Sequence, residues 1–287
     1  MPEGGNPAAV ENVATRPVPS AESRALSTYY AGIQADLLSQ GLLRTDRGEV
    51  ISGLNARQLA ENFTRIALYD EYTLTGERLV AMPTASSLRR WESPVVINVE
   101  FGDTVPEAQR RRDLRSIGTY ASRLSRITGL PITLGQAGAN FHVLILNEDE
   151  RRTYGPRLRR LVPGVSDSSV RAVEDMPRST FCLMNAFAGA ADTAAFFAAV
   201  AVIRAEHPDR MRLSCIHEEI AQGLGLTNDS RAARPSIFND DEEFALLTGH
   251  DELLLRILYD PRLRIGMDES EATPIVRTIA EELMGGS

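Results

Sequence analysis

The segment from Cys215 to Asp229 constrains what this 287-residue chain can fold into more than any other. It predicts one amphipathic helix, because a helix turns by about 100° per residue and sorts its side chains onto opposite faces. The apolar face comprises Leu213, Ile216, Ile220 and Leu224. The polar face comprises Cys215, Glu218, Glu219 and Gln222. Such a helix is either one wall of a site or an ordinary surface helix, and only the spacing to Gly225 and Asn228 distinguishes it from the many ordinary helices with a similar polar face.

The polar residues have the spacing of a metal-binding motif. His217 and Glu218 look like the start of a His-Glu-x-x-His zinc motif, but Ala221 stands where the second histidine is needed. In the next register, Glu218 and Gln222 lie one helical turn apart, and Asn228 follows ten residues after Glu218. This is the histidine spacing of the metzincin peptidases. The chain therefore resembles the metzincin clan, and the segment is similar to a bacterial family known only as domain-of-unknown-function number 2927.

The resemblance implies a zincin-like fold over roughly residues 90–267. It places Glu219 in the position of the general base that activates a metal-bound water. It places Glu218, Gln222 and Asn228 in the positions of the three zinc histidines. The alternative interpretation of Glu219 is a solvated carboxylate on a polar helix face.

The altered ligands change the metal that such a site would prefer. Carboxylate and amide oxygens are hard donors, so they hold zinc poorly and suit calcium or magnesium better, with help from Asp229 or water. His217 shares the apolar face with Leu224 and is expected in the core, although a rotated helix would bring it to the site. Gly225 is expected to end the helix with a positive φ. We expect either a divalent ion, zinc or calcium, or a site that has lost its metal.

The segment after the motif gives a mixed signal. Ile237 and Phe238 stand where metzincins place a methionine beneath the metal, so this methionine is absent. Further on, Thr248 is a predicted N-cap and Asp251 its partner in a capping box. The helix that they begin, over residues 247–259, resembles the C-terminal helix that closes matrixin-type domains.

The pattern upstream of the motif alternates between strands and helices. Strands are predicted over residues 94–101, 131–134, 140–146 and 179–184. Helices are predicted over residues 110–128, where Gly129 ends the helix, over the alanine-rich residues 190–205 and over residues 212–224. This order predicts an α+β, zincin-like domain in which one sheet packs on long helices.

The N-terminal part of the chain has a different character. Residues 1–20 are rich in Pro, Ala, Gly and Asn without periodicity, so they predict a flexible tail. Apolar residues recur at helical spacing over residues 20–44 and 55–69. We therefore expect a small helical appendage over residues 21–88, which packs or docks, and a zincin-like domain over residues 89–287.

Composition excludes several partners. All 31 basic residues are arginines, against 39 acidic residues, so the formal net charge is -8. An acidic surface argues against nucleic acid as the main partner. The longest apolar stretch, residues 186–203, is interrupted by Asp192 and Thr193, so we expect no membrane span. A peptide or protein, as substrate or partner, fits the resemblance, whereas the oligomeric state leaves no signal in the sequence.

The two cysteines bear on where the protein works. An exported chain would join Cys182 and Cys215 in a disulfide, whereas a cytosolic chain would keep both reduced. The opening residues, Met-Pro-Glu-Gly-Gly-Asn-Pro, are typical of a chain that follows a removed export segment. We therefore expect a periplasmic or secreted protein with one disulfide.

The remaining polar residues each have two interpretations. His142 lies in a predicted strand that resembles the zincin edge strand, where substrate peptides pair, but an ordinary cross-strand position fits as well. His207 and His250 are expected at the surface. The acidic run over residues 239–243 is either a calcium loop or, more simply, a solvated loop.

Three functions remain open. The first is a metal-dependent hydrolase, such as a peptidase, with Glu219 as its base. The second is an inactive pseudo-peptidase that serves as a binding or scaffold protein in the cell envelope. The third is a structural module of a larger envelope assembly, with the N-terminal helices as its docking arm.

Overall fold

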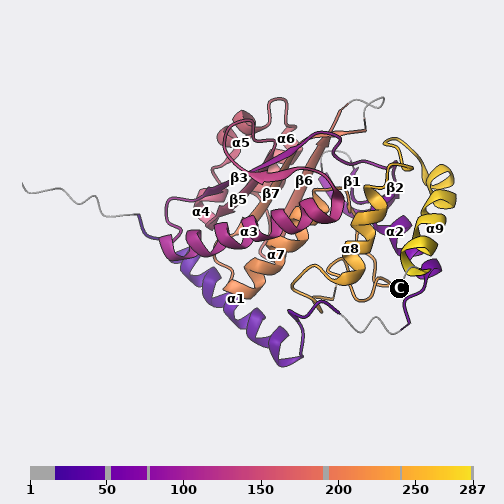
Figure 1. Cartoon of the computed structure of the whole chain (residues 1–287). Coiled ribbons are helices and arrows are strands. Elements are labelled where there is room, and N and C mark those ends of the chain that lie inside the picture. The colour runs from indigo at the N-terminus through magenta and orange to yellow at the C-terminus, as the bar shows by residue number, and fades with distance from the viewer. Residues whose placement is uncertain (1–16, 49–52, 76–77, 190–193, 240, 286–287) are drawn as a thin grey trace, which may run out of the picture.

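A computed structural model describes residues 17–48, 53–75, 78–189, 194–239 and 241–285, and within residues 71–83 it describes the backbone only. Most of the predicted tail therefore lies outside the described residues. The described chain forms an α+β fold with a mixed five-stranded sheet (Figure 1). Its strands are β3 (Val95–Phe101), β4 (Ile132–Leu134), β5 (Phe141–Leu146), β6 (Cys182–Ala188) and β7 (Phe196–Arg204).

The order of the strands places one antiparallel strand at an edge. The sheet runs β4-β3-β5-β7-β6, in which β4, β3, β5 and β7 are parallel and β6 pairs with β7 in the antiparallel direction. Two of the parallel connections contain helices, as parallel strands require. The strand β6 is thus a terminal strand with one side of its backbone turned away from the sheet.

Helices cover both faces of this sheet (Figure 1). One face packs against α3 (Glu107–Thr128) and α7 (Asp209–Gln222), and the other packs against the short helices α5 (Gly155–Leu161) and α6 (Asp167–Glu174). The remaining helices of the described chain are α1 (Ala21–Ser39), α2 (Ala56–Ala67), α4 (Glu148–Arg151), α8 (Gly249–Leu258) and α9 (Glu269–Gly285). A separate two-stranded sheet joins β1 (Tyr69–Thr75) to β2 (Arg78–Ala85).

The main core lies on the face of the sheet that α3 and α7 cover. Alternate residues of β5, such as Phe141 and Val143, point into it, as the two-residue period of a strand dictates. Ile220 of α7 meets them, and Phe63 of α2 belongs to the same cluster. The domain boundary drawn at residue 88 stays a prediction, although α2 shares this core.

Several predicted boundaries are close to those observed. The helix α3 ends as expected at Gly129, which has a φ of 72° and so terminates the helix in the left-handed region. The capping box predicted for Thr248 and Asp251 is present at the start of α8. Local signals of this kind are reliable because they depend on residues within one turn.

The alanine-rich helix predicted over residues 190–205 is wrong. Residues 190–193 lie outside the described residues, and Phe196–Arg204 form the strand β7. This strand is buried on both faces, with Ala199 in the main core and Val202 in the cluster beneath α5 and α6. A continuous apolar run is typical of such a strand, and its pairing partners override the helical preference of alanine.

Two elements have no counterpart in the sequence-based prediction. The hairpin of β1 and β2 falls within the region expected to be helical only, and α9 falls within a region expected to be irregular. Pro274 argues against α9 in the sequence, because it lies inside the helix and removes one of its backbone hydrogen bonds. Ala272 and Val276 then bury the inner face of α9 in the main core.

No helix of the described chain has both the length and the hydropathy that a bilayer-spanning segment needs.

Candidate functional site

A cleft of about 250 Å³ lies between the start of β6 and one face of α7. Residues 179–184 form one wall, and α7 forms the other. The lining residues from α7 are Met211, Ser214, Cys215, Glu218, Glu219 and Gln222. Asp229 and Glu242 complete the lining from the loops that follow α7. The cleft is therefore bordered by an edge strand on one side and by the polar face of a helix on the other.

Packing of the apolar face fixes how α7 presents its polar face. Ile216, Ile220 and Leu224 are buried in the main core, as their spacing predicted. Glu218, Glu219 and Gln222 consequently turn toward the cleft. Glu219 is only 4 % exposed, so its carboxylate lies deep in the wall rather than in open solvent.

Asn228, which the spacing placed with these residues, lies elsewhere. Its side-chain amide donates a hydrogen bond of 2.8 Å to the carbonyl of Arg65, and its backbone N–H donates one of 3.0 Å to the carbonyl of Ile66. Both acceptors are at the C-terminal end of α2, where helix carbonyls lack partners within the helix. Asn228 therefore satisfies the end of α2 and is not among the described residues that line the cleft.

The exit from α7 has the backbone geometry that its glycine predicts. The helix ends at Gln222 with Gly223 as its C-cap, slightly earlier than expected. Gly225 has a φ of 124°, and a Cβ on it would lie 2.4 Å from the carbonyl oxygen of Arg89. Only glycine fits this position, because both the conformation and the close backbone approach exclude a side chain.

His217 lies on the core side of α7. Its ring stacks on that of Tyr120 at a centroid distance of 3.9 Å, and its Nδ1 accepts a hydrogen bond of 3.1 Å from the N–H of Leu247. Burial, with a smaller contribution from Arg123, lowers the pKa of His217 to about 3. The imidazole is therefore neutral at pH 7 and tied to the core, facing away from the cleft.

The residues do not fit a zinc centre. Within the described parts of the chain, no group of three or more His, Cys, Asp and Glu side chains is arranged to hold a metal ion. Asn228 is committed to the carbonyl of Arg65, and Phe238, which stands where metzincins place a methionine, is buried in the main core. The donors that remain at the cleft are carboxylate and amide oxygens, which zinc does not favour.

A disulfide between Cys182 and Cys215 joins the two walls of the cleft. The Cα atoms are 5.9 Å apart, and the bond links the first residue of β6 to the middle of α7. This confirms the predicted pairing. The covalent link keeps the edge strand next to the polar face of the helix.

The other three histidines are buried, which corrects two expectations. His207 and His250 were expected at the surface but are only 2 % and 0 % exposed. His207 packs between the rings of Tyr30 and Phe181, and the Nε2 of His250 lies 3.1 Å from the side-chain amide of Asn62. These contacts leave no signal in the sequence, because their partners come from distant segments.

Of the two interpretations of His142, the ordinary cross-strand position holds, because its strand is not at an edge. It lies in β5, between β3 and β7, in register with Asn98 and Val200. The side chain sits on the face of the sheet opposite the main core, among neighbours that include Glu100. The edge strand that borders the cleft is β6.

The described residues of the acidic run over 239–243 make separate contacts rather than one shared site. Asp240 lies outside the described residues. Asp241 forms an ion pair with Arg234, and Glu243 forms one with Arg44 at 3.0 Å. Glu242 lines the cleft. This position could not be predicted from the sequence, because only tertiary structure brings this loop beside α7.

Comparisons with known proteins gave one match. No curated protein and no solved structure matched the chain. The model of a protein family of unknown function, DUF2927, matched residues 56–278, which include α7, β6 and the loops around the cleft. The chain therefore belongs to the protein family of unknown function DUF2927.

Proposed function

We propose that the cleft between β6 and α7 binds an extended, basic segment of a peptide or protein, and that the domain acts as a zincin-like binding or scaffold protein. The observation that carries the proposal is that an antiparallel terminal strand forms one wall of the cleft. A terminal strand can pair with an added strand through its outward N–H and C=O groups. The metzincin resemblance implies the same use of an edge strand beside the motif helix.

The charge of the cleft favours a basic occupant. Its lining includes Glu218, Glu219, Asp229 and Glu242, and the formal net charge of the whole chain is -8. Charges that are partly buried are screened less by salt than charges in open solvent. Alternate side chains of an added strand point the same way, so every second residue of the bound segment would face these carboxylates.

The disulfide supports a location in the periplasm or outside the cell. Disulfides persist in oxidising compartments and are rare in the reducing cytosol. The bond between Cys182 and Cys215 crosses the cleft that we propose as the binding site. An exported scaffold protein would keep this cleft intact without depending on a bound metal.

The proposal is tested with an unstructured nonapeptide of alternating Arg and Val, and with a second nonapeptide in which Glu replaces Arg. We expect only the first to bind and to slow amide exchange along β6. Glu218→Arg should weaken its binding about tenfold, because it places a like charge beside the peptide. Glu281→Arg on the exposed face of α9 is the matched control and should leave binding unchanged.

Two results would contradict this proposal. One is equal binding of the basic and the acidic nonapeptide, which would remove the role of the carboxylates. The other is binding that leaves the amides of β6 exchanging at their original rates, which would remove the role of the edge strand.

A metal-dependent hydrolase is the second candidate. It is favoured by one observation, that Glu218, Glu219 and Gln222 reach the same cleft at the motif spacing. In this alternative Glu219 is the general base. Stoichiometric metal in the purified protein by mass spectrometry, with peptide hydrolysis that Glu219→Gln abolishes, would replace the scaffold proposal. No metal, and binding that Glu219→Gln leaves intact, would favour the scaffold.

A further inference from the structure

The N-terminal helix α1 packs one narrow stripe of its side chains into the rest of the protein. The stripe comprises Ser23, Leu26, Tyr30, Ile33 and Leu37. Only Ser23 and Tyr30 are fully buried, and the remainder of the helix is largely exposed. Little apolar area therefore holds α1 in place, so its polar contacts determine where it lies.

One of these polar contacts caps the helix α7. The N-cap of α7 is Pro208, whose side chain has no acceptor for the free N–H groups of the first turn. The N–H of Met211, the third residue of the helix, instead donates a hydrogen bond of 3.1 Å to Oε1 of Gln34. Gln34 thus does for α7 what a serine or asparagine N-cap does within one helix.

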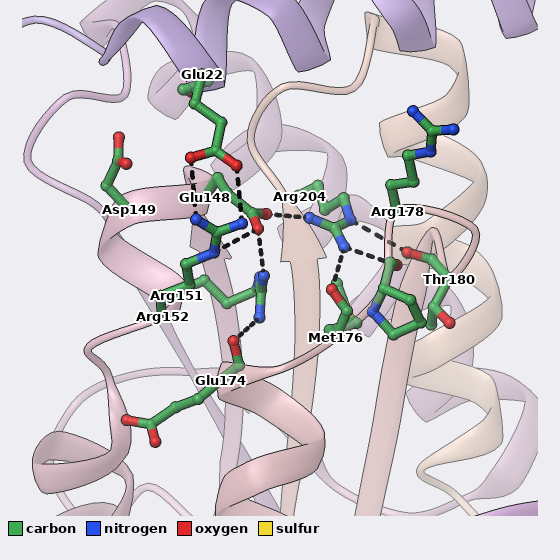
Figure 2. Close-up of polar contacts among 12 residues, drawn as sticks. Glu22, Glu148, Asp149, Arg151, Arg152, Glu174, Met176, Arg178, Thr180 and Arg204 are labelled. Atoms are coloured by element: carbon green, nitrogen blue, oxygen red, sulfur yellow. Dashed lines mark hydrogen bonds and ion pairs between the residues drawn. The ribbon is translucent and has the colours of Figure 1, made fainter.

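A second contact fixes the segment that leads into β6. The hydroxyl of Tyr30 donates a hydrogen bond of 2.9 Å to the carbonyl of Arg178, and its ring packs edge-on against Phe181 at 6.1 Å. Arg204 of β7 also holds this segment, because it donates to the carbonyls of Thr180 at 3.1 Å and Met176 at 2.8 Å (Figure 2). Residues 176–181 are therefore held by both α1 and β7.

The first turn of α1 is anchored to a buried group of charges. Glu22 receives two hydrogen bonds from Arg152, at 2.9 and 2.8 Å, and Arg152 also pairs with Glu148 at 2.9 Å (Figure 2). Glu148 is buried with Arg204 and Arg151, at 2.5 and 2.7 Å. The buried charges fix one another, and Arg152 links them to α1 through its pair with Glu22, in which both side chains are about half exposed.

The cleft and the surface beneath α1 share side chains. Phe181 and Met211 line the cleft, and both also belong to the cluster that packs around Tyr30. We infer that α1 is a clamp that positions both walls of the cleft, with Gln34 and Tyr30 as its positioning residues. The binding unit then extends to residue 21, although the family match begins at residue 56. The consequence for peptide binding rests on the proposed function, whereas the clamp itself rests on the contacts.

Hydrogen exchange of the full chain tests the clamp without any ligand. Gln34→Ala should speed exchange of the Met211 amide by about fivefold, which corresponds to the loss of one side-chain cap. Gln34→Glu keeps an acceptor oxygen and should restore slow exchange. Tyr30→Phe should speed exchange at residues 180–182, whereas Tyr29→Phe is the matched control, because Tyr29 is 39 % exposed.

Binding of the Arg-Val nonapeptide tests the consequence. Gln34→Ala and Tyr30→Phe should each weaken it severalfold, and Gln34→Glu should restore it. Exchange at α7 and β6 that matches the wild type in both variants would overturn the clamp. Faster exchange with unchanged peptide affinity would overturn its consequence for binding. A wild-type protein that binds no peptide would refute the proposed function, and the exchange data would then decide on the clamp alone.

Discussion

The helix α7, which lines the candidate cleft, and the helix α1, which contacts the lining residues Phe181 and Met211, are held in the fold in different ways. In α7, ten of the fourteen residues are buried, including the acidic Glu219 and the histidine His217. In α1, only two of the nineteen residues are buried. Both helices show the same helical spacing of apolar residues in the sequence. Helical spacing of apolar residues therefore predicts that a segment is a helix, but not how strongly the fold depends on that helix.

The largest expected effect concerns the exit from α7. Gly225→Ala would force a Cβ against the carbonyl oxygen of Arg89 at a φ of 124°. We expect a loss of about 4 kcal/mol in the free energy of unfolding, because neither the strain nor the backbone contact can relax easily. Chemical denaturation measures this loss.

Gly138→Ala is the matched control. Gly138 also has a positive φ, 70°, but nothing lies within 4 Å of the added Cβ. It should cost about 1 kcal/mol, the usual penalty for the left-handed region. Equal losses in the two variants would contradict the claim that α7 is set by close packing at its end.

Acid should lower the stability of the fold through His217, the buried histidine of α7. The pKa of His217 is lowered to about 3 by burial, whereas an unfolded histidine titrates near 6.5. The unfolded chain therefore takes up the proton first, so the contribution of His217 is complete above about pH 6.5. It is lost as the pH falls toward 3, by up to about 1.4 kcal/mol per pH unit.

The comparison of wild type with His217→Gln isolates this effect. Gln keeps an acceptor for the N–H of Leu247 but does not titrate, so its stability should fall less steeply between pH 6.5 and 5. His207, whose pKa is also lowered to about 3 by burial, should keep its own share of the slope. Identical slopes for the two proteins, measured by denaturation at each pH, would show that His217 is not a buried neutral group.

Sequence reasoning was most successful where a feature depends on neighbours in the chain. The apolar face of α7, the positive φ of Gly225 and the capping box of α8 all follow from residues within a few positions. Spacing also brought Glu218 and Gln222 to one cleft, because one helical turn separates them. The disulfide between Cys182 and Cys215 was expected from the even count of cysteines together with signs of export.

The features that the sequence did not predict share a different cause, since each of them depends on contacts with residues far along the chain. Asn228 turns to the carbonyl of Arg65, 163 residues away, so motif spacing could not predict its direction. The strand β7 looks helical in isolation and is a strand because β5 and β6 flank it. Gln34 caps α7 across 177 residues, and only the missing acceptor at Pro208 could have suggested that such a partner exists.

The smallest expected effect concerns the ion pair at the start of α1. Glu22 and Arg152 are each about half exposed, at 50 % and 48 % of their side chains. We expect Glu22→Gln to lower the free energy of unfolding by less than about 1 kcal/mol, because water and salt screen such pairs. The loss should disappear in about 1 M salt, where the screening length is only about 3 Å.

Asp149→Asn is the control for this pair, because Asp149 is an exposed acidic residue of α4 that lies away from Glu22 in Figure 2. It should change stability at neither salt concentration. A double-mutant cycle of Glu22→Gln with Arg152→Gln then gives the coupling between these two side chains directly. A coupling of several kcal/mol that persists in high salt would mean that α1 is built into the fold as firmly as α7, and the contrast between the two helices would be lost.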